Sequence, residues 1–255
     1  MRRALILSVP LAVLALSPCS AAQQPPPVQR DPQAVAILAQ SMAAMGSMSL
    51  PRDSVARGTI TLADGRSGTI MLKSKGADRL RHEVSLDGKD SVMVAGGSKG
   101  HVSPGTETRN LPHWVTMYLR PQHLYAHFRL AESSKPGAKL IYVGQENVNG
   151  QPAHHIRISN VSADAKQADI EEIISECHVF IDAQTSLVVK TITYDFSPLL
   201  VQNRTPVETY LSDYRAVSGI LVPHRMTRYI WGNKDSEIVL NSVQVNVGLP
   251  ESDFQ

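Results

Sequence analysis

The chain has 255 residues, of which 42% are apolar and 19% charged, and its formal net charge at pH 7 is +2. This near-neutral balance argues against nucleic acid or an anionic membrane as the main partner, because both require a strongly basic surface. Cys19 and Cys177 are the only cysteines, so the fold must depend on its hydrophobic core and not on a set of disulfides.

Residues 1–22 have the pattern of a secretory signal peptide. Two arginines form a basic start, and the mostly apolar run that follows, Ala4–Leu16, is too short to be a stable membrane helix. Ser20 and Ala22 are the small residues that cleavage after residue 22 requires. We therefore expect export to the periplasm, with equal numbers of basic and acidic residues once the two arginines are removed.

Cys19 could also be read as a lipid-attachment site, because Leu16 stands three residues before it. Lipoprotein signals require a small residue directly before the cysteine, whereas this chain has Pro18 there. The sequence thus disfavours lipid anchoring at Cys19 and favours a soluble periplasmic protein.

Residues 23–31 contain three consecutive prolines and predict an extended linker, followed by a single domain over residues 32–255. Asp31 and Pro32 are suited to be the N-cap and the first residue of a helix. Apolar residues then recur at helical spacing until Gly46, a natural stop; they are Val35, Leu38, Met42 and Met45. The sequence therefore predicts an amphipathic N-terminal helix with a methionine-rich end.

Beyond this helix the apolar residues recur with a period of two, which is typical of strands with one buried and one solvated face. The expected strands are residues 59–62, 69–73, 80–86, 91–95, 139–143, 153–159, 173–181, 187–194, 207–214, 221–231 and 237–247. The acidic residues between positions 164 and 176 fit a solvated loop around the strand at 173–181. So many strands joined by short turns predict a mainly β (α+β) fold, an antiparallel sandwich or barrel.

The segment Leu111–Leu130 interrupts the β pattern. Leu111, Trp114 and Tyr118 are spaced three and four residues apart, which predicts a short helix. Pro121 ends that helix, and a second helical turn follows it. Because the segment is rich in aromatic residues and lies between strands that already satisfy their own pairing, we interpret it as a short helical lid.

Gly96–Gly100 matches the pattern G-x-S-x-G literally, with Ser98 in the place of a nucleophile. A nucleophile elbow needs a strand before the serine and a helix after it. The following residues, His101–Gly105, include a proline and cannot be the core of a helix. The pattern therefore favours a glycine-rich hairpin turn over a serine hydrolase.

His123 and His127 stand four residues apart, as two zinc ligands do in the motif H-E-x-x-H. Leu124 occupies the position of the general base, and His113, a possible third ligand, is separated from the pair by Pro121. The pattern favours histidines that pack against a neighbouring element. We assign no metal site, no cofactor and no catalytic residue.

Four longer stretches are interpreted as strand pairs around a turn: "SVMVAGGSKGHVSPGTET", "VGQENVNGQPAHHIRI", "CHVFIDAQTSLVVKTITYD" and "YLSDYRAVSGILVPHRMTRY". In this order they resemble the outer-membrane lipoprotein carrier superfamily, which has the LolA/LolB-like fold, and the resemblance covers residues 32–254. In the last stretch Gly219 suits a turn. Pro223 lacks an N–H, so it belongs at a sheet edge or where the ladder has not begun.

The resemblance implies a curved antiparallel sheet that forms a half-open barrel, with the helices capping its mouth. It also implies a cavity that receives acyl chains of lipoproteins. The expected ligand-binding residues are Met42, Met45, Trp114, Met117, Tyr118, Leu124 and Phe128. Methionine is common in adaptable apolar sites, although ordinary core packing would explain the same residues.

Three functions remain open. The first is a monomeric, non-enzymatic periplasmic carrier for a lipoprotein acyl chain or another apolar ligand. The second is an envelope sensor that binds an envelope protein partner, and the third is a zinc or serine hydrolase. A cavity lined by the lid would favour the carrier. A filled barrel with an exposed apolar groove would favour the sensor, and a tight cluster of histidines or carboxylates would favour the hydrolase.

Overall fold

The structure, a computed structural model, describes residues 28–97, 99–116, 119–162, 164, 166–197 and 200–255. The expected signal peptide and most of the expected linker lie outside these residues. The strands are β1 (Asp53–Leu62), β2 (Ser67–Lys75), β3 (Arg79–Leu86), β4 (Lys89–Gly96), β5 (Lys99–Pro104), β6 (Arg109–Asn110), β7 (Ala138–Val148), β8 (Gln151–Asn160), β9 (Cys177–Asp182), β10 (Val188–Ser197), β11 (Leu200–Val217), β12 (Ile220–Ile230) and β13 (Asn233–Val245). The α-helices are α1 (Pro32–Ala44), α2 (His113–Thr116), α3 (Tyr125–Ser133) and α4 (Ala168–Ser175), and the 3₁₀ helices are η1 (Gln122–Leu124) and η2 (Glu251–Phe254).

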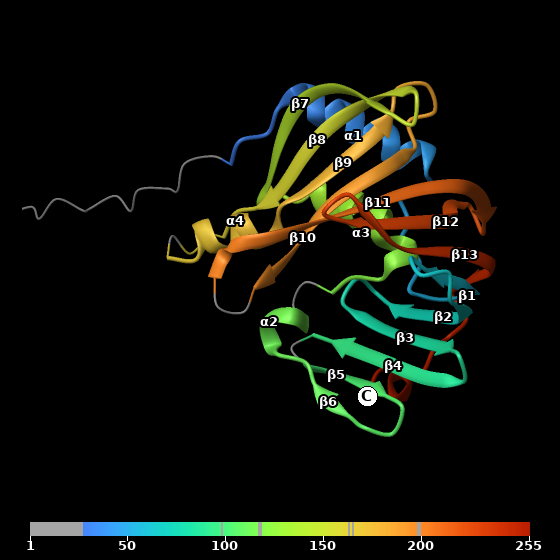
Figure 1. The fold of residues 1–255 in the computed structure, drawn as a ribbon. Coiled ribbons are helices and arrows are strands. Elements are labelled where there is room, and N and C mark those ends of the chain that lie inside the picture. Colours follow the sequence, from blue (N-terminus) through green and yellow to red (C-terminus); the bar gives the residue numbers. More distant parts are fainter. Residues whose placement is uncertain (1–27, 98, 117–118, 163, 165, 198–199) are drawn as a thin grey trace, which may run out of the picture.

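The described strands form one antiparallel sheet in the order β6-β5-β4-β3-β2-β1-β13-β12-β11-β10-β9-β8-β7. Strands β6 and β7 are its two edges, so the sheet curves without closing (Figure 1). The helical segment between residues 111 and 133 connects these two edges along the chain. The expected mainly β fold with an unclosed antiparallel sheet is confirmed.

Helix α1 begins and ends at the expected residues. The side chain of Asp31 caps it, because Oδ1 accepts a hydrogen bond from the N–H of Gln33 at 2.8 Å. Pro32 occupies the first turn, where no intrahelical donor is needed. After the C-cap residue Met45, Gly46 takes a φ of +69°, a left-handed conformation that favours glycine.

The end of the expected linker is attached to the edge strand β7. The N–H of Asp31 donates to the carbonyl of Leu140 at 2.9 Å, and the N–H of Leu140 donates to the carbonyl of Gln29 at the same distance. The guanidinium of Arg30 donates to three carbonyls, those of Ser133, Lys135 and Ala138. These contacts cover part of an exposed strand edge, which would otherwise invite pairing with another chain.

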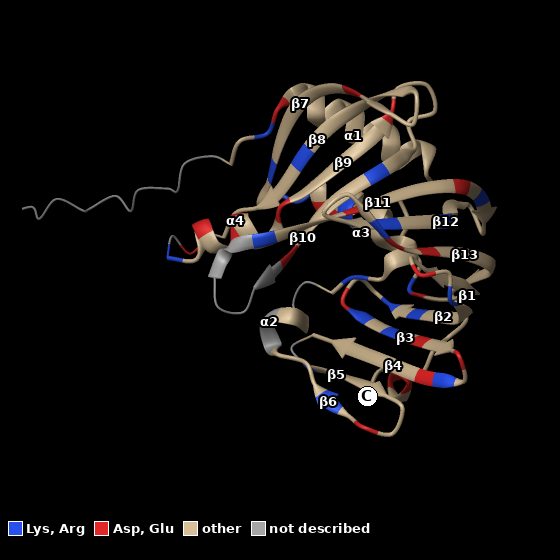
Figure 2. Ribbon diagram, viewed as in Figure 1, with Lys and Arg blue, Asp and Glu red and all other residues tan. Residues whose placement is uncertain are grey.

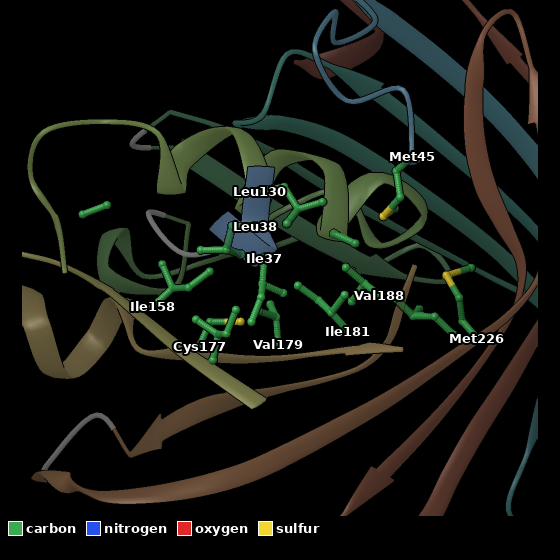
Figure 3. Close-up of a cluster of buried hydrophobic side chains, with 14 of the residues drawn as sticks. Ile37, Leu38, Met45, Leu130, Ile158, Cys177, Val179, Ile181, Val188 and Met226 are labelled. Atoms are coloured by element: carbon green, nitrogen blue, oxygen red, sulfur yellow. The ribbon is translucent and has the colours of Figure 1, made fainter. Parts of the chain in front are cut away.

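We call the face of the sheet that contacts α1 and α3 the inner face. Ile37 and Leu38 of α1 and Leu130 of α3 lie against it in the largest apolar cluster (Figure 3). Their labelled neighbours on β8, β9 and β10 are Ile158, Cys177, Val179, Ile181 and Val188. Burial of this apolar area, at about 25 cal/mol per Å², holds the two helices on the sheet and fills this half of the barrel.

The hairpin between β11 and β12 has a two-residue turn, because Val217 pairs with Ile220. Both turn residues, Ser218 and Gly219, have positive φ, +47° and +90°, as the turn type that suits tight hairpins requires. Pro223 of β12 pairs with β11, whereas the pairing of β12 with β13 begins only two residues later. The missing N–H of this proline therefore faces no β13 partner. Its position before the ladder between β12 and β13 begins agrees with the expectation.

The expectation of a strand over residues 173–181 is wrong in its first part. The chain is helical until Ser175, and strand β9 begins at Cys177. The sequence has a helical signal there, since three isoleucines recur at helical spacing: Ile170, Ile173 and Ile174. Asp169 and Glu171 lie in the first turn, where the helix dipole favours negative charge. Most of the acidic residues of this region thus belong to α4 and not to a loop.

The outer face of β2 and β3 is covered by the C-terminal helix η2. Lys73 pairs with Asp253 at 3.0 Å, and Lys75 and Arg79 both pair with Glu251. Figure 2 shows the basic residues of β2 and β3, with an acidic residue farther along β3. The positive charges on the outer face of these two strands are therefore neutralised within the chain.

Asp53, at the start of β1, fixes the chain that follows β13. Its buried carboxylate accepts hydrogen bonds from the N–H groups of Val247 at 2.6 Å, Gly248 at 3.0 Å and Leu249 at 3.1 Å. Hydrogen bonds to an ionised group are stronger than neutral ones, so this side chain holds the segment that leads to η2.

Among the described residues, no helix has the length and apolar character needed to cross a membrane.

Candidate functional site

The inner face of β1–β5 is covered by α1 and α3 only at β1 and β2, where Ala56 and Leu72 belong to the apolar cluster beneath these helices. One row of residues crosses these five strands, each directly opposite the next: Ser54, Ser74, Leu80, Ala95 and Gly100. The first four are at most 1% exposed. This row is therefore polar on β1 and β2 and apolar on β3 and β4.

The next row on the same face is Ala56, Leu72, His82, Met93 and Val102. Ala56 and Leu72 are fully buried, and His82 is 8% exposed. Met93 and Val102 are partly exposed, as is Val84 of the following row. Burial in this row thus decreases from β1 towards β5, where Met93 and Val102 are partly exposed.

Helix α2 covers one end of this surface. A β-carbon on Gly100 would lie 2.8 Å from Cγ2 of Thr116 and 2.7 Å from the carbonyl oxygen of Val94. Only glycine at this position lets α2 approach strand β5 so closely. The expected helical lid is present and rests on the inner face, although its helix is only four residues long.

The structure describes the side chains of only two of the five expected lid residues, Leu124 and Phe128. Trp114 belongs to α2, where only its backbone is described, and Met117 and Tyr118 lie outside the described residues. Leu124 is fully buried in η1, and Phe128 is 3% exposed in α3. The role of all five in ligand binding stays a prediction.

The remaining expected residues lie in two apolar clusters. Leu124 and Phe128 pack with Ile220 and Val222 of β12. Met45 is fully buried in the cluster beneath α1, and Met42 packs against its margin. The sequence-predicted set is therefore divided between two parts of the interior. The carbonyl of Met45 accepts a hydrogen bond from the N–H of Leu221, the neighbour of Ile220 and Val222, at 3.0 Å.

His123 and His127 form separate hydrogen bonds inside the barrel. His127 Nδ1 lies 2.6 Å from Ser47 Oγ and its Nε2 lies 2.9 Å from the carbonyl oxygen of Leu221. His123 Nε2 lies 2.8 Å from Ser54 Oγ. Both nitrogens of His127 are thus occupied, and no group of three metal-binding side chains exists among the described residues.

Sequence reasoning placed His82 on the buried face of its strand but gave it no role. Its position between Leu80 and Val84, on the side that alternation marks as apolar, was the available signal. Burial lowers the pKa of His82 to about 4. The imidazole is therefore neutral at pH 7 and faces the interior beside the other buried histidines.

The G-x-S-x-G stretch lies in the hairpin between β4 and β5. Gly96 pairs with Lys99, and Gly97 takes a φ of +58° in the turn. The chain continues as strand β5 and not as a helix. The local geometry is that of the expected hairpin turn and does not form a nucleophile elbow; Ser98 itself is outside the described residues.

A polar chain of side chains crosses the outer face of β8 and β9. His155 Nδ1 lies 2.5 Å from Glu146, and its Nε2 lies 2.6 Å from Nδ1 of His178. His178 Nε2 lies 3.2 Å from Glu176, which also pairs with Arg204 at 2.9 Å. Burial lowers the pKa of His178, against the effect of Glu176, which raises it. These groups satisfy one another, so we interpret them as a structural network.

A hollow of about 390 Å³ lies beside β11 and β12. The rings of Tyr210 and Tyr229, which line it, meet edge to face at a centroid distance of 5.4 Å. Its carboxylate, Glu208, is already paired with Lys190 at 2.5 Å. The hollow is lined mainly by polar side chains. An apolar ligand fits the inner face of β3–β5 better, because Met93 and Val102 are partly exposed there, and we therefore place the candidate site on that face.

Solved structures with a similar fold include proteins from three bacteria. An outer membrane lipoprotein-sorting protein domain from Vibrio parahaemolyticus matches with a TM-score of 0.55 and 13% identity, over 88% of this chain and 96% of that one. A LolA superfamily protein from Nitrosomonas europaea matches with a TM-score of 0.52 and 10% identity, over 87% and 97% of the two chains. The fold is LolA-like.

A third similar structure is a DUF1329 family protein from Desulfovibrio piger, with a TM-score of 0.52 and 15% identity over 89% of this chain and 98% of that one. No protein-family model and no curated protein matches the sequence. The resemblance to the LolA/LolB-like carriers is therefore confirmed at the level of the fold. Identities of 10–15% do not transfer a ligand from one chain to another.

Proposed function

We propose that this protein is a non-enzymatic binding or carrier protein of the periplasm for a lipoprotein acyl chain or another apolar ligand. The ligand lies on the inner face of β3–β5, beneath α2. The single observation that carries this proposal is the set of partly exposed apolar side chains there, Val84, Met93 and Val102, on a face that a helical segment overhangs. Ligand sites are usually concave and mostly apolar, with a few polar groups.

The similar fold of a lipoprotein-sorting domain supports this proposal. The hairpin geometry of the G-x-S-x-G stretch and the hydrogen bonds of His123 and His127 support a non-enzymatic role, because they match neither a nucleophile elbow nor a zinc site. We therefore assign the protein no enzymatic activity. We further propose that the protein is exported after cleavage behind residue 22 and carries no lipid on Cys19. In the periplasm it is a monomer.

Val102→Lys should reduce the affinity for an apolar fluorescent probe by at least about tenfold. The substitution places a charged side chain on the inner face, where its desolvation opposes ligand binding. Ser103→Lys is the matched control, because the neighbouring residue points to the outer face. Fluorescence titration with both variants measures the effect, and equal affinities would place the probe elsewhere.

Trp114→Ala should weaken binding of an acyl-lipid probe by about 1–3 kcal/mol, since a large ring contributes on that scale when a ligand buries it. Leu124→Ala, at a fully buried position, should instead act mainly on stability. Titration and denaturant unfolding of both variants distinguish the roles. If Trp114→Ala binds the probe normally and unfolds as easily as Leu124→Ala, the lid is ordinary core.

A second candidate function, a module that binds an envelope protein, is favoured by helix α4. Ile170 and Ile173 of this helix are 54% and 37% exposed, which is unusual for neighbouring apolar residues on one helix. Native mass spectrometry of protein purified from its own host separates the two functions. A bound mass of lipid size supports the carrier, whereas a stoichiometric protein lost in an Ile170→Glu variant supports the module.

A further inference from the structure

Two buried imidazole nitrogens on the inner face have no hydrogen-bond partner among the residues that the structure describes. They are Nε2 of His82 and Nδ1 of His123, whose residues are 8% and 1% exposed. In the described part of the chain only one other buried side-chain nitrogen or oxygen lacks a partner, Nε of Arg129. Leaving such a group unpaired costs about 1–3 kcal/mol, so two of them in one region indicate a partner from outside the chain.

The fold places both histidines over the same part of the sheet. His123 is fixed by its Nε2, 2.8 Å from Ser54 Oγ, and that hydroxyl lies 2.6 Å from Ser74 Oγ. His82 lies opposite Leu72, two residues along β2 from Ser74 and on the same face. Such diagonal positions are about 7–8 Å apart, within the reach of an imidazole ring. The charge of a protonated His82 also disfavours protonation of His123 and so adds to the effect of burial in lowering its pKa.

The pair can offer one donor and one acceptor. A neutral imidazole has one of each, so the free nitrogen of His123 takes the role opposite to the one its Nε2 plays towards Ser54. The hydroxyls of Ser54 and Ser74 can rotate to suit either arrangement. A hydroxyl group, or the carbonyl and hydroxyl of a glycerol ester, matches such a pair.

The surroundings disfavour a charged ligand group. The basic residues of β2 and β3 nearest in sequence lie on the outer face and pair with acidic residues, as Lys73 does with Asp253 and Arg81 with Glu83. A carboxylate or phosphate at the imidazoles would thus be desolvated without a cation. From His82 the partly exposed apolar surface continues through its row neighbours Met93 and Val102.

We propose that His82 and His123 bind the neutral hydroxyl or ester group of an acyl lipid, whose chain lies along the inner face of β3–β5. This inference rests on the proposed function and adds to it the chemical class of the head group. The lipid is recognised at its uncharged oxygen atoms. A fatty-acid anion is bound only through its chain.

Displacement of the fluorescent probe N-phenyl-1-naphthylamine at pH 8 tests the inference, with dodecanol and dodecanoate as competitors. Dodecanol should bind about tenfold more tightly than dodecanoate, since two hydrogen bonds of ordinary strength correspond to about that ratio. His82→Phe should lose this preference, measured as the ratio of the affinities of dodecanol and dodecanoate for the variant. His101→Phe, a substitution of the same kind on β5, should retain it.

A second measurement does not depend on the variants. In protein labelled with nitrogen-15 at histidine, dodecanol should shift the resonances of His82 Nε2 and His123 Nδ1. If the probe binds but dodecanol shows no preference and no shift, the inference is wrong and the proposed function stands. If the wild-type protein does not bind the probe, the proposed function fails and the inference fails with it.

Discussion

Lowering the pH from 7 to 5 should lower the free energy of unfolding by roughly 6 kcal/mol, which is comparable to the whole stability of many domains. The cause is three imidazoles buried inside the barrel, those of His82, His123 and His127. Burial lowers the pKa of His82 and of His127 to about 4. Burial lowers that of His123 to about 3, and its neighbours His82 and His127 add to this effect.

The direction of this pH effect follows from the difference in histidine pKa between the folded and the unfolded chain. A histidine in the unfolded chain has a pKa of about 6.5, so between pH 6.5 and about 4 the unfolded chain binds protons that the folded chain does not. The contribution of each histidine to the free energy of unfolding is therefore fully present above pH 6.5 and is lost as the pH falls towards 4. Each loses about 1.4 kcal/mol per pH unit, and the three together about 4 kcal/mol.

Denaturant unfolding at several pH values between 7 and 5 measures this effect. His82→Leu should reduce the slope of stability against pH by about a third, because one of three titrating groups is removed. Leu72→Ala, opposite His82 on the neighbouring strand, should lower stability by a similar amount at every pH. An unchanged denaturation midpoint between pH 7 and pH 5 would mean that these imidazoles are accessible to protons in the folded protein.

The sequence predicts the elements whose residues follow one periodic pattern. Helix α1 has both a cap and a helical apolar stripe, and the hairpin at Ser218-Gly219 has its turn residues, so both form as expected. Helix α4 is missed because its eight residues give a short apolar pattern, which resembles the start of the following strand. Short apolar runs do not distinguish a helix from a strand on pattern alone.

Periodic patterns in the sequence do not predict the polar part of the candidate site. Ser54 and Ser74 lie at the ends of β1 and β2, outside the expected strands, because serine weakens the alternating pattern. His123 meets Ser54 across 69 residues of sequence, a contact that only the curvature of the sheet creates. The lid, in contrast, is expected from its aromatic residues, since these interrupt a long β pattern.

Arg129→Met should lower the free energy of unfolding by about 3–5 kcal/mol, the cost of removing one partner of a buried ion pair. Arg129 is 5% exposed and its guanidinium lies 2.7 Å from the carboxylate of Glu132. The same group donates to the carbonyl of Ser175 at 2.9 Å and, at 3.4 Å, to that of Ile158. One side chain thus joins α3 to the end of α4 and to β8.

Methionine fills part of the volume of the arginine but removes the shorter of the two ion pairs of Glu132, whose carboxylate keeps Arg120 at 3.7 Å, and it removes the guanidinium donor from the carbonyl of Ser175. The double variant Arg129→Met/Glu132→Gln should recover part of the loss, because the buried negative charge is then removed as well. Arg57→Met, at an exposed position of β1, should change stability by less than about 0.5 kcal/mol. Urea unfolding of the three variants measures these differences. If Arg129→Met is as mild as Arg57→Met, water replaces the guanidinium at these groups and the junction of α3 with α4 does not depend on the ion pair.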